Sequence, residues 1–248
     1  MSDDNASTSA LGRRISRWMR EQVDAANAEG LVFGLSGGLD SSVVAALSKM
    51  AVGPKALGLI MPCHSSPKAA KHARLVARKL SIAIATVDLT PVCDGLVRRL
   101  PKGAGIAPAN IRPRLRMTAL YYYGNLQNKL VVGTANKTEI QVGYFTKWGD
   151  GAVDLLPLGD LYKTQVRRLA KELHIPQEIM DKQPTADLWA GQTDEQELGI
   201  TYDELDAILA AIESGRVGGF DPDKIERVRG LIAMSEHKRA PVPVFRNQ

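Results

Sequence analysis

The segment Leu31–Ser42, LVFGLSGGLDSS, decides the fold and organises the rest of the chain. Its apolar start predicts a short strand, its two adjacent glycines predict a tight turn, and Asp40 opens a helix. Because glycine has no Cβ, a ligand can approach the backbone of such a turn, and the N–H groups at a helix start attract anions. A carboxylate beside a phosphate requires a bridging cation. The segment therefore predicts a polyphosphate-binding loop that contains a metal ligand.

This loop differs from the commoner phosphate-binding loops. No lysine follows Gly38, so the pattern G-x-x-x-x-G-K-[ST] is absent, and G-x-G-x-x-G is absent as well. The pattern S-G-G-x-D-S resembles the PP-loop of the ATP pyrophosphatases. An ordinary strand-to-helix turn, capped by Asp40 or Ser41, is the alternative interpretation. The position of the loop at the start of an α/β pattern favours nucleotide binding.

Composition sets the broad class of the protein. A chain of 248 residues can bury the core of one α/β domain, and 44% hydrophobic with 24% charged residues is typical of globular proteins. The net charge of +5 suits small anions, and no basic block is long enough to indicate nucleic-acid binding. Cys63 and Cys93 fit neither a metal site nor a disulfide framework. Without a membrane-length apolar run or a signal peptide, we expect a cytoplasmic protein, with residues 1–10 disordered.

Apolar strand segments alternate with helical patterns along the first half of the chain. Strands are predicted at 31–33 (LVF), at 56–61 (ALGLIM), at 82–87 (IAIATV) and at 129–134 (KLVVGT). This alternation predicts an α/β fold with a Rossmann-like, doubly wound parallel sheet, of the adenine-nucleotide-hydrolase kind, flanked by helices and followed by a helical C-terminal part. Ligands of such sheets bind at the carboxyl ends of the strands.

Two irregular segments predict loops. Residues 101–108 (PKGAGIAP) form a Gly/Pro break, and residues 183–197 lack helical or strand periodicity. Loops of this composition often close over substrates, and the sequence leaves open whether these two are lids.

Polar clusters fall at the predicted strand ends and in the loops. Glu139, in GTANKTE at 133–139, could share a cation with Asp40, or it could merely favour the dipole of its own helix. Lys163 could donate to a phosphate, or it could be a solvated residue near a helix start. Neither residue decides the function alone.

Taken together, these clusters resemble the ammonia-dependent NAD synthetase family. The resemblance extends from about Ala25 to Arg239, and the block Gly143–Asp206 is not shared by other PP-loop enzymes. The chain has no amino-terminal amidase-like domain of the glutamine-dependent members, so residues 1–248 are expected to form a single NAD synthetase domain. The matching segments are SGGLDSS at 36–42, GTANKTE at 133–139, GYFTKWGDGAVDLLPLGDLYKTQV at 143–166, KQPTADLWAGQTDEQELGITYDELD at 182–206 and EHKR at 236–239.

The resemblance implies a ligase that completes NAD biosynthesis. Deamido-NAD⁺, ATP and ammonia would give NAD⁺, AMP and pyrophosphate through an adenylated nicotinate carboxylate. The family binds its substrate across a two-fold dimer interface, so a homodimer is expected. Whether ammonia is supplied free or by a separate glutaminase partner stays open.

The resemblance also implies roles for individual residues. Asp40, Asp150 and Lys163 would be catalytic, with Asp150 near the incoming ammonia. Asp40 and Glu139 would hold Mg²⁺. The ATP-binding positions would be Gly34, Leu35, Ser36, Gly37, Gly38, Leu39, Asp40, Ser41, Ser42, Thr134, Lys163 and Thr185, and the deamido-NAD-binding positions would be Asn110, Arg114, Tyr144, Lys147, Asp154, His237 and Lys238.

Some positions stay open or depart from the family pattern. Arg114 could be a surface charge, and His237 could be a frayed tail residue. The segment 62–68 (PCHSSPK) lacks the arginine that often follows the second strand in this family, so the adenine contacts there are undefined. Pro113 lies inside a predicted helix, which should therefore start near Ile111 with Asn110 as its cap.

Two other functions compete with this interpretation. A different PP-loop synthetase, such as a GMP synthetase-like enzyme or a tRNA-modifying ligase, would share the first cluster but not Gly143–Asp206. A non-catalytic nucleotide-binding homologue would be expected to lack Asp40, Glu139, Asp150 or Lys163, and all four are present.

Overall fold

The computed structural model describes residues 2–185 and 193–247, with side chains from residue 10 onward. Within these residues a four-stranded sheet has the order β3-β2-β1-β4, and every neighbouring pair is parallel. Leu31 in the central strand pairs with Ala56 on one side and with Leu130 on the other. The predicted parallel α/β fold is confirmed. The strands are β1 (Gly30–Gly34), β2 (Ala56–Ile60), β3 (Ala83–Thr86) and β4 (Lys129–Val132).

Strand β1 is buried on both of its faces. Successive side chains of a strand point to opposite sides, so Leu31 and Phe33 join one core cluster while Val32 joins another. All three side chains are fully buried, as expected for the centre of a parallel sheet. Each contributes about 1.5–3 kcal/mol of hydrophobic free energy. The sheet therefore holds the end of β1, where the PP-loop begins, in a fixed place.

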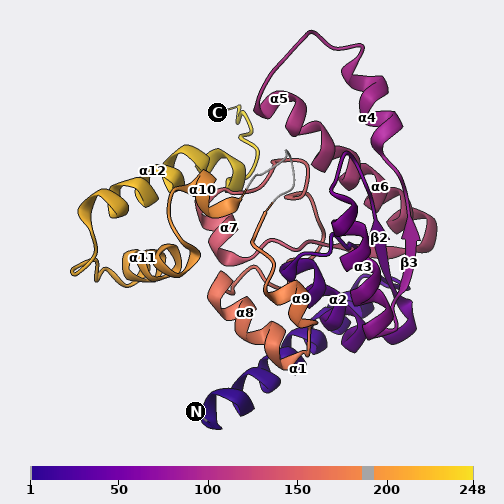
Figure 1. Cartoon of the computed structure of the whole chain (residues 1–248), viewed down its shortest axis with the longest axis horizontal. Helices are drawn as coiled ribbons and strands as arrows, with labels where there is room; N and C mark the ends of the chain where they lie inside the picture. Colours follow the sequence, from indigo (N-terminus) through magenta and orange to yellow (C-terminus); the bar gives the residue numbers. More distant parts are fainter. Residues whose placement is uncertain (1, 186–192, 248) are drawn as a thin grey trace.

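Helices cover both faces of the sheet (Figure 1). Residues of α1, α2, α3, α8 and α9 form the core on one face, and residues of α4 and α6 pack on the other. The helices are α1 (Ser2–Ala25), α2 (Leu39–Val52), α3 (Pro67–Leu80), α4 (Thr90–Val97), α5 (Ile106–Ala109), α6 (Ile111–Gln127), α7 (Lys137–Val142), α8 (Lys163–Glu172), α9 (Gln177–Met180), α10 (Asp194–Leu198), α11 (Tyr202–Ser214) and α12 (Pro222–Arg239), with a short 3-10 turn η1 (Gly53–Lys55) before β2.

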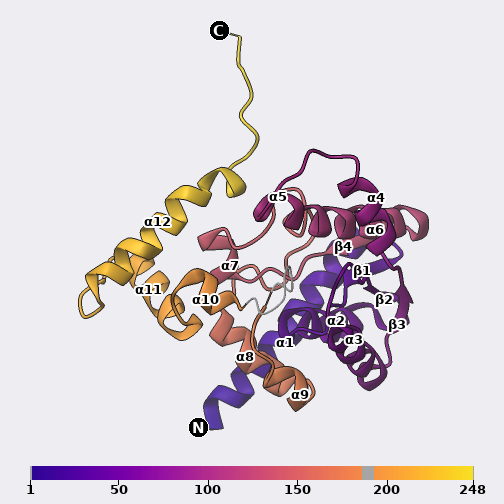
Figure 2. The same ribbon diagram turned by 45° about the horizontal axis from the view of Figure 1, so that its top comes forward.

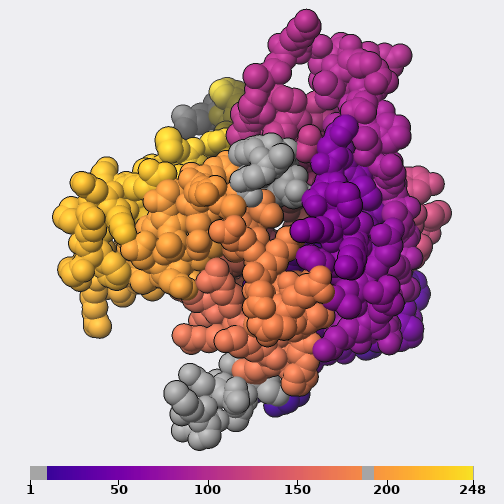
Figure 3. All heavy atoms as spheres, viewed as in Figure 1, coloured from indigo at the N-terminus to yellow at the C-terminus, as the bar shows by residue number. Residues whose placement is uncertain are grey.

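The C-terminal helices form a separate layer beside the sheet. The segment of α11 and α12 stands to one side of the α/β body (Figures 2 and 3). The chain beyond α12 extends away from that body (Figure 2). Val142 of α7 packs with Leu205, Ile208 and Val228 of α11 and α12 in a third core cluster. Because α7 directly follows the end of β4, this layer is attached to the edge of the sheet that carries the predicted site.

The structure corrects two expectations about irregular segments. Helix α1 begins at Ser2, and the expected disorder of residues 1–10 stays a prediction. Helix α5 occupies the end of the loop predicted at 101–108. Helix α10 replaces the end of the loop predicted at 183–197, with the Thr193 side chain accepting from the N–H of Gln196. Residues 186–192 of the predicted loop lie outside the described part of the chain. That the whole chain is one domain stays a prediction.

No described helix combines the length and the apolar composition that crossing a membrane would require. The longest one, α1, carries several charged residues along its sequence.

We expect Gly143→Ala to destabilise the protein by about 3 kcal/mol. Gly143 ends α7 with φ +68°, and a Cβ there would overlap the side chain of Ser235 on α12. The measurement is urea unfolding followed by circular dichroism. Gly218→Ala is the matched control, because no atom lies within 4 Å of its added Cβ. Equal stabilities of the two variants would contradict the packing of α12 against α7.

Candidate active site

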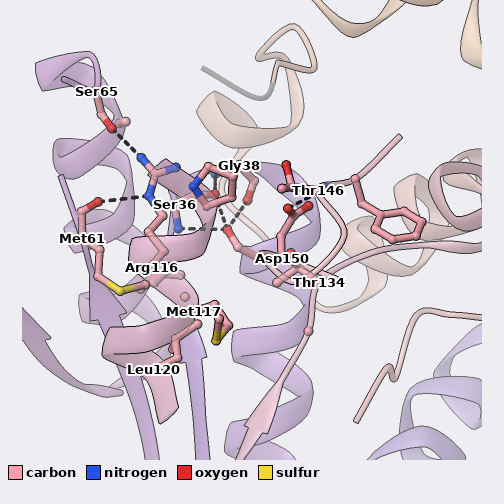
Figure 4. A pocket seen from close by; sticks show the side chains of 18 of the residues that line it. Ser36, Gly38, Met61, Ser65, Arg116, Met117, Leu120, Thr134, Thr146 and Asp150 are labelled. Carbon is pink, nitrogen blue, oxygen red and sulfur yellow. Dashed lines mark hydrogen bonds between the residues drawn. The ribbon is translucent and has the colours of Figure 1, made fainter. Parts of the chain in front are cut away.

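A cavity of about 680 Å³ opens at the carboxyl ends of the strands (Figure 4). Its wall combines the ends of β1, β2 and β4 with parts of α3, α6 and the segment after α7. Many predicted site residues line this cavity, although Asp40, Glu139 and Lys163 do not, and their roles stay predictions. Those that line it are Gly34, Leu35, Ser36, Gly38, Ser41, Asn110, Thr134, Tyr144, Asp150, Thr185 and Lys238.

Hydroxyl groups hold the PP-loop in shape. The Oγ atoms of Ser36 and Ser41 are hydrogen-bonded at 2.9 Å, and the N–H of Gly38 donates to Ser36 Oγ at 3.2 Å. The hydroxyls of Ser41 and Ser42 donate to the carbonyl of Gly38 at 3.1 and 2.7 Å. The loop is therefore organised by its own side chains.

Backbone geometry explains the two glycines of this loop. Gly37 has φ +74°, and a Cβ there would lie 2.5 Å from the backbone carbonyl oxygen of Ala69 on α3. Gly38 is the N-cap of α2 and offers no side chain to the N–H groups at the start of that helix. Those N–H groups and the helix dipole make this end of α2 suitable for an anion.

A buried lysine joins the two predicted metal ligands. The ammonium of Lys163 lies 2.5 Å from Asp40 Oδ2 and 3.3 Å from Glu139 Oε1, and the lysine is only 3% exposed. Asn136 donates to Asp40 Oδ1 at 3.1 Å. Asn136 also forms a capping box with Glu139 at the start of α7. The sequence analysis missed Asn136, although the spacing Asn136-x-x-Glu139 is a capping-box signal.

The two carboxylates and the ammonium shift one another's proton affinity. Burial raises the pKa of Glu139 from 4.5 to about 8, with Lys163 opposing and the charge of Asp40 adding to the rise. Burial lowers the pKa of Lys163, but Asp40 and Glu139 more than offset it, so its pKa lies above the ordinary value. Lys163 thus stays charged beside Asp40, and Glu139 keeps its proton near neutral pH. A cation that displaces this proton would meet two carboxylates.

We expect Glu139 to make the free protein less stable as the pH rises from about 5 to 8. A carboxyl group whose folded-state pKa is raised binds its proton more tightly in the folded state, so stability is lost between the unfolded and folded pKa values. Glu139→Gln should remove this slope. Urea unfolding at pH 5.5 and pH 8, without metal or nucleotide, measures it. Glu204→Gln is the control, because Glu204 is paired with Lys224 at the surface and its pKa is lowered. If Glu139→Gln still loses stability as the pH rises, Glu139 is not the group whose raised pKa causes the loss.

Asp150 faces the cavity and is anchored by Thr146. Its Oδ1 accepts from the N–H of Thr146 at 3.0 Å, and the Thr146 hydroxyl donates to Asn110 Oδ1 at 2.8 Å. Although Asp150 is accessible from the cavity, desolvation by the surrounding protein raises its pKa, with the hydrogen bond from Thr146 opposing. Helix α6 begins at Ile111 as predicted, but the Asn110 side chain does not cap it. Asn110 instead accepts from Thr146, at the cavity wall.

Tyr144 and Lys238 line the cavity beside Asp150. The Tyr144 hydroxyl donates to Asp194 and Glu197 of α10 at 3.1 and 2.8 Å. Burial raises the pKa of Tyr144, so it stays protonated as a donor. The ammonium of Lys238 donates to the carbonyls of Gly143 and Phe145, and burial lowers its pKa. The C-terminal helix α12 therefore contributes directly to the cavity wall.

The remaining predicted substrate residues do not line this cavity. Asp154 accepts from the hydroxyl of Tyr121 at 3.0 Å and from the N–H of Val131 at 2.8 Å, which joins α6 to β4. Arg114 donates to the carbonyl of Lys147 at 3.3 Å, and the Lys147 ammonium donates to the carbonyl of His237. The predictions that these residues bind deamido-NAD⁺ stay predictions.

Arg116 is a cavity residue that the sequence analysis did not assign. Its Nε donates to the carbonyl of Met61 at 3.2 Å and its Nη2 donates to Ser65 Oγ at 3.0 Å (Figure 4). Helix α6 thereby supplies a guanidinium to the end of β2, where the segment 62–68 contains no arginine of its own. The only sequence signal was the spacing of Arg116 two residues after Arg114.

The fold and this site define a nucleotide-binding α/β protein of the PP-loop class. Residues 11–242 match the family described as NAD synthase. The chain therefore belongs to the NAD synthase family. The match extends through the block Gly143–Asp206.

Similar proteins cover almost the whole chain. The NH(3)-dependent NAD(+) synthetase of Carboxydothermus hydrogenoformans is 45% identical over 231 residues, which are 91% of this chain and 93% of that protein. Among solved structures, the NMN synthetase from Francisella tularensis has a TM-score of 0.88 and 36% identity, covering 96% of this chain and 99% of that one. The NH3-dependent NAD synthetase from Campylobacter jejuni, in complex with the nitrate ion, has a TM-score of 0.85 and 26% identity over the same shares.

Proposed function

We propose that this protein is an ammonia-dependent NAD synthetase, a ligase that forms the amide bond of NAD⁺ from deamido-NAD⁺, ATP and ammonia. The observation that carries the proposal is the convergence of the PP-loop and Asp150 on one cavity, with the buried Lys163 cluster joined to the PP-loop segment through Asp40. The match to the NAD synthase family over residues 11–242 supports it and disfavours a GMP synthetase-like alternative.

The first half-reaction activates the nicotinate carboxylate. One carboxylate oxygen attacks the α-phosphorus of ATP, the bond from that phosphorus to the bridging oxygen breaks, and pyrophosphate leaves. The N–H groups around Gly38, the hydroxyls of Ser36 and Ser41, and the ammonium of Lys163 are the donors for the departing anion. Donors that are already in place stabilise such charge more effectively than water does. The bond cleaved is therefore the α–β phosphate bond.

Asp40 and Glu139 are the residues that would hold Mg²⁺. Both are carboxyl side chains beside one lysine, and carboxylates suit this hard cation. Within residues 2–185 and 193–247 no group of three or more acidic, histidine or cysteine side chains could complete a metal cage. That agrees with the usual Mg²⁺ site of one or two carboxylates plus substrate phosphates. When bound, the ion would neutralise charge on the leaving pyrophosphate.

The second half-reaction forms the amide. The nitrogen of ammonia attacks the carbonyl carbon of the mixed anhydride, and AMP leaves with the bonding electrons of the broken C–O bond. Only neutral ammonia is nucleophilic, so ammonium must first lose a proton. Asp150, with its raised pKa and its position in the cavity wall, is a suitable acceptor.

The homodimer and the cytoplasmic location are parts of the same proposal. Large apolar side chains are exposed on α4 and α6, including Val92, Leu96, Tyr122 and Leu126. Exposed large apolar side chains gathered in a patch are typical of protein interfaces. Arg114 and Lys147 lie outside the cavity of a single chain, which suits a substrate site completed by a second copy. Sedimentation analysis of the purified protein tests the dimer.

The function is tested by AMP release from ATP in the presence of ammonium. We expect AMP to form only when deamido-NAD⁺ is present. Nicotinate mononucleotide is the comparison substrate, because the Francisella structure is described as an NMN synthetase. Preference for nicotinate mononucleotide would favour an NMN synthetase over an NAD synthetase. AMP formation that needs neither substrate would contradict both functions. Failure of ATP to bind at all would also contradict a non-catalytic nucleotide-binding role.

A further inference from the structure

A buried carboxylate on α11 holds the start of α8 from outside that helix. Asp206 is 5% exposed, and its Oδ1 accepts from the hydroxyl of Thr138 at 2.5 Å. Its Oδ2 accepts from the N–H of Thr164 at 2.8 Å. The oxygen of the Thr138 hydroxyl accepts, in turn, from the N–H of Lys163 at 2.9 Å. The first two N–H groups of α8 are thus bound by side chains of α7 and α11.

This arrangement replaces the usual local cap of a helix. The first N–H groups of a helix have no partner within it, and the side chain of the preceding residue commonly accepts from one of them. In α8 that residue is Tyr162, whose hydroxyl does not cap the helix, and the only local contribution among the described residues is Gln165, which accepts from the N–H of Tyr162 at 2.8 Å. The Tyr162 hydroxyl donates instead to Glu213, at 2.9 Å. The start of α8 therefore depends on residues distant in the sequence.

The residue placed by this cap is Lys163. It is the first residue of α8, and its ammonium contacts Asp40 and Glu139. Thr138 precedes Glu139 directly, so its hydroxyl links the backbone of α7 beside Glu139 to the backbone of Lys163. One chain of hydrogen bonds, from Asp206 through Thr138 to Lys163, fixes the lysine relative to both carboxylates.

We infer that Asp206 and Thr138 are positioning residues, which set the place of the Lys163 ammonium at the phosphates of ATP. The inference rests on the proposed function, in which Lys163 stabilises the leaving pyrophosphate. Neither residue lines the cavity. Both act through Lys163, and the C-terminal layer of helices thereby takes part in phosphate binding.

The chemistry of the two partners favours a carboxylate at position 206. A carboxylate oxygen accepts hydrogen bonds, and both partners donate to Asp206. In Asp206→Asn, the side-chain oxygen can still accept from the N–H of Thr164, and the NH₂ group then faces the Thr138 hydroxyl. That hydroxyl would have to turn and accept from the NH₂ group as well as from the N–H of Lys163, which weakens its hold on Lys163. A shift of about 1 Å in a group at the reaction centre can cost about 100-fold in rate.

The test measures kcat and KM for ATP in variants of the two positions. Asp206→Asn and Thr138→Val should each lose about 10- to 100-fold in kcat/KM for ATP, as supporting residues of reactive sites typically do. Thr138→Ser keeps the hydroxyl and should stay within about threefold of the wild type, because the relay is intact. Asp203→Asn is the matched control on the same helix. Asp203 is exposed and pairs with Arg167 at 3.4 Å, so its loss should leave kcat/KM unchanged.

A double-mutant cycle separates positioning from a general effect on folding. ATP binding is measured by calorimetry for Asp206→Asn alone, for Lys163→Met alone, and for the pair. If Asp206 acts through Lys163, adding Asp206→Asn to Lys163→Met causes no further loss of affinity. If Asp206→Asn lowers ATP affinity equally in the wild type and in Lys163→Met, the inference is overturned. It is also overturned if Thr138→Ser is as impaired as Thr138→Val. The calorimetry uses ATP without the dinucleotide, so it tests the inference independently of the substrate. If the proposed function is wrong, the wild type will bind ATP but will not form AMP from deamido-NAD⁺.

Discussion

Asp40→Asn is expected to lower the rate of AMP formation by about 10³-fold or more, because charge stabilisation at a leaving phosphate is among the largest single terms in catalysis. Asp40 contacts Lys163 at 2.5 Å and accepts from Asn136 at 3.1 Å, so it stands at the centre of the charged cluster. An asparagine keeps the shape and can still accept from Asn136, but it removes one of two carboxylates from the cation site. The measurement is steady-state AMP release at several Mg²⁺ concentrations.

The control for this variant is Asp160→Asn. Asp160 is almost fully exposed and lies 3.5 Å from Lys137, so its pair contributes little. We expect wild-type rates and an unchanged melting temperature. For Asp40→Asn we expect a folded protein whose ATP binding no longer responds to Mg²⁺. Near-normal turnover would refute the metal role of Asp40.

Lys163→Met should abolish activity and destabilise the protein. Removing the ammonium leaves Asp40 and Glu139 facing each other while largely buried, and breaking a buried ion pair in this way costs about 3–5 kcal/mol. The rate of AMP formation should fall about 10³-fold, as for the loss of other preorganised donors. Urea unfolding and AMP release measure the two effects. The destabilisation should shrink at low pH, where the unpaired carboxyl groups are protonated.

Lys137→Met provides the comparison on the neighbouring helix start. Lys137 pairs with Glu213 at 3.0 Å and lies 4.8 Å from the centre of the Tyr162 ring. This pair is closer to solvent, so its removal should cost about 1 kcal/mol or less. If both lysine variants lose stability equally at all pH values, the buried cluster does not carry the energy that we assign to it.

The sheet and the PP-loop were predictable because their causes are local. Apolar runs bounded by turn residues marked the four strands, and buried parallel strands need no other signal. The serines and glycines of 36–42 shape their loop through contacts among themselves and with one neighbouring helix. A local motif of this kind can be recognised without knowing the rest of the fold.

Other parts of the site were not predictable because their partners are distant. Asn110 was expected to cap α6, but its side chain accepts a hydrogen bond from Thr146, which is 36 residues away in the sequence. Asp154 joins α6 to β4, a contact that the sequence did not indicate, and its binding of substrate stays a prediction. The pairing of Lys163 with Asp40 spans 123 residues. No periodicity or spacing in the sequence encodes such contacts, since they depend on how separate elements pack.

The long sequence separation of the Lys163 contacts has a consequence for the folding pathway. Contacts between distant segments require closure of long loops, whose entropic cost must be met before the contacts can form. The bond between Lys163 and Asp40 closes 123 residues, and that between Thr138 and Asp206 closes 68. The sheet pairs β1 with β2 over a much shorter span, whereas its pairing of Leu31 with Leu130 also joins distant segments. During refolding, secondary structure should therefore recover before ATP binding, and nucleotide affinity should report the last step of folding.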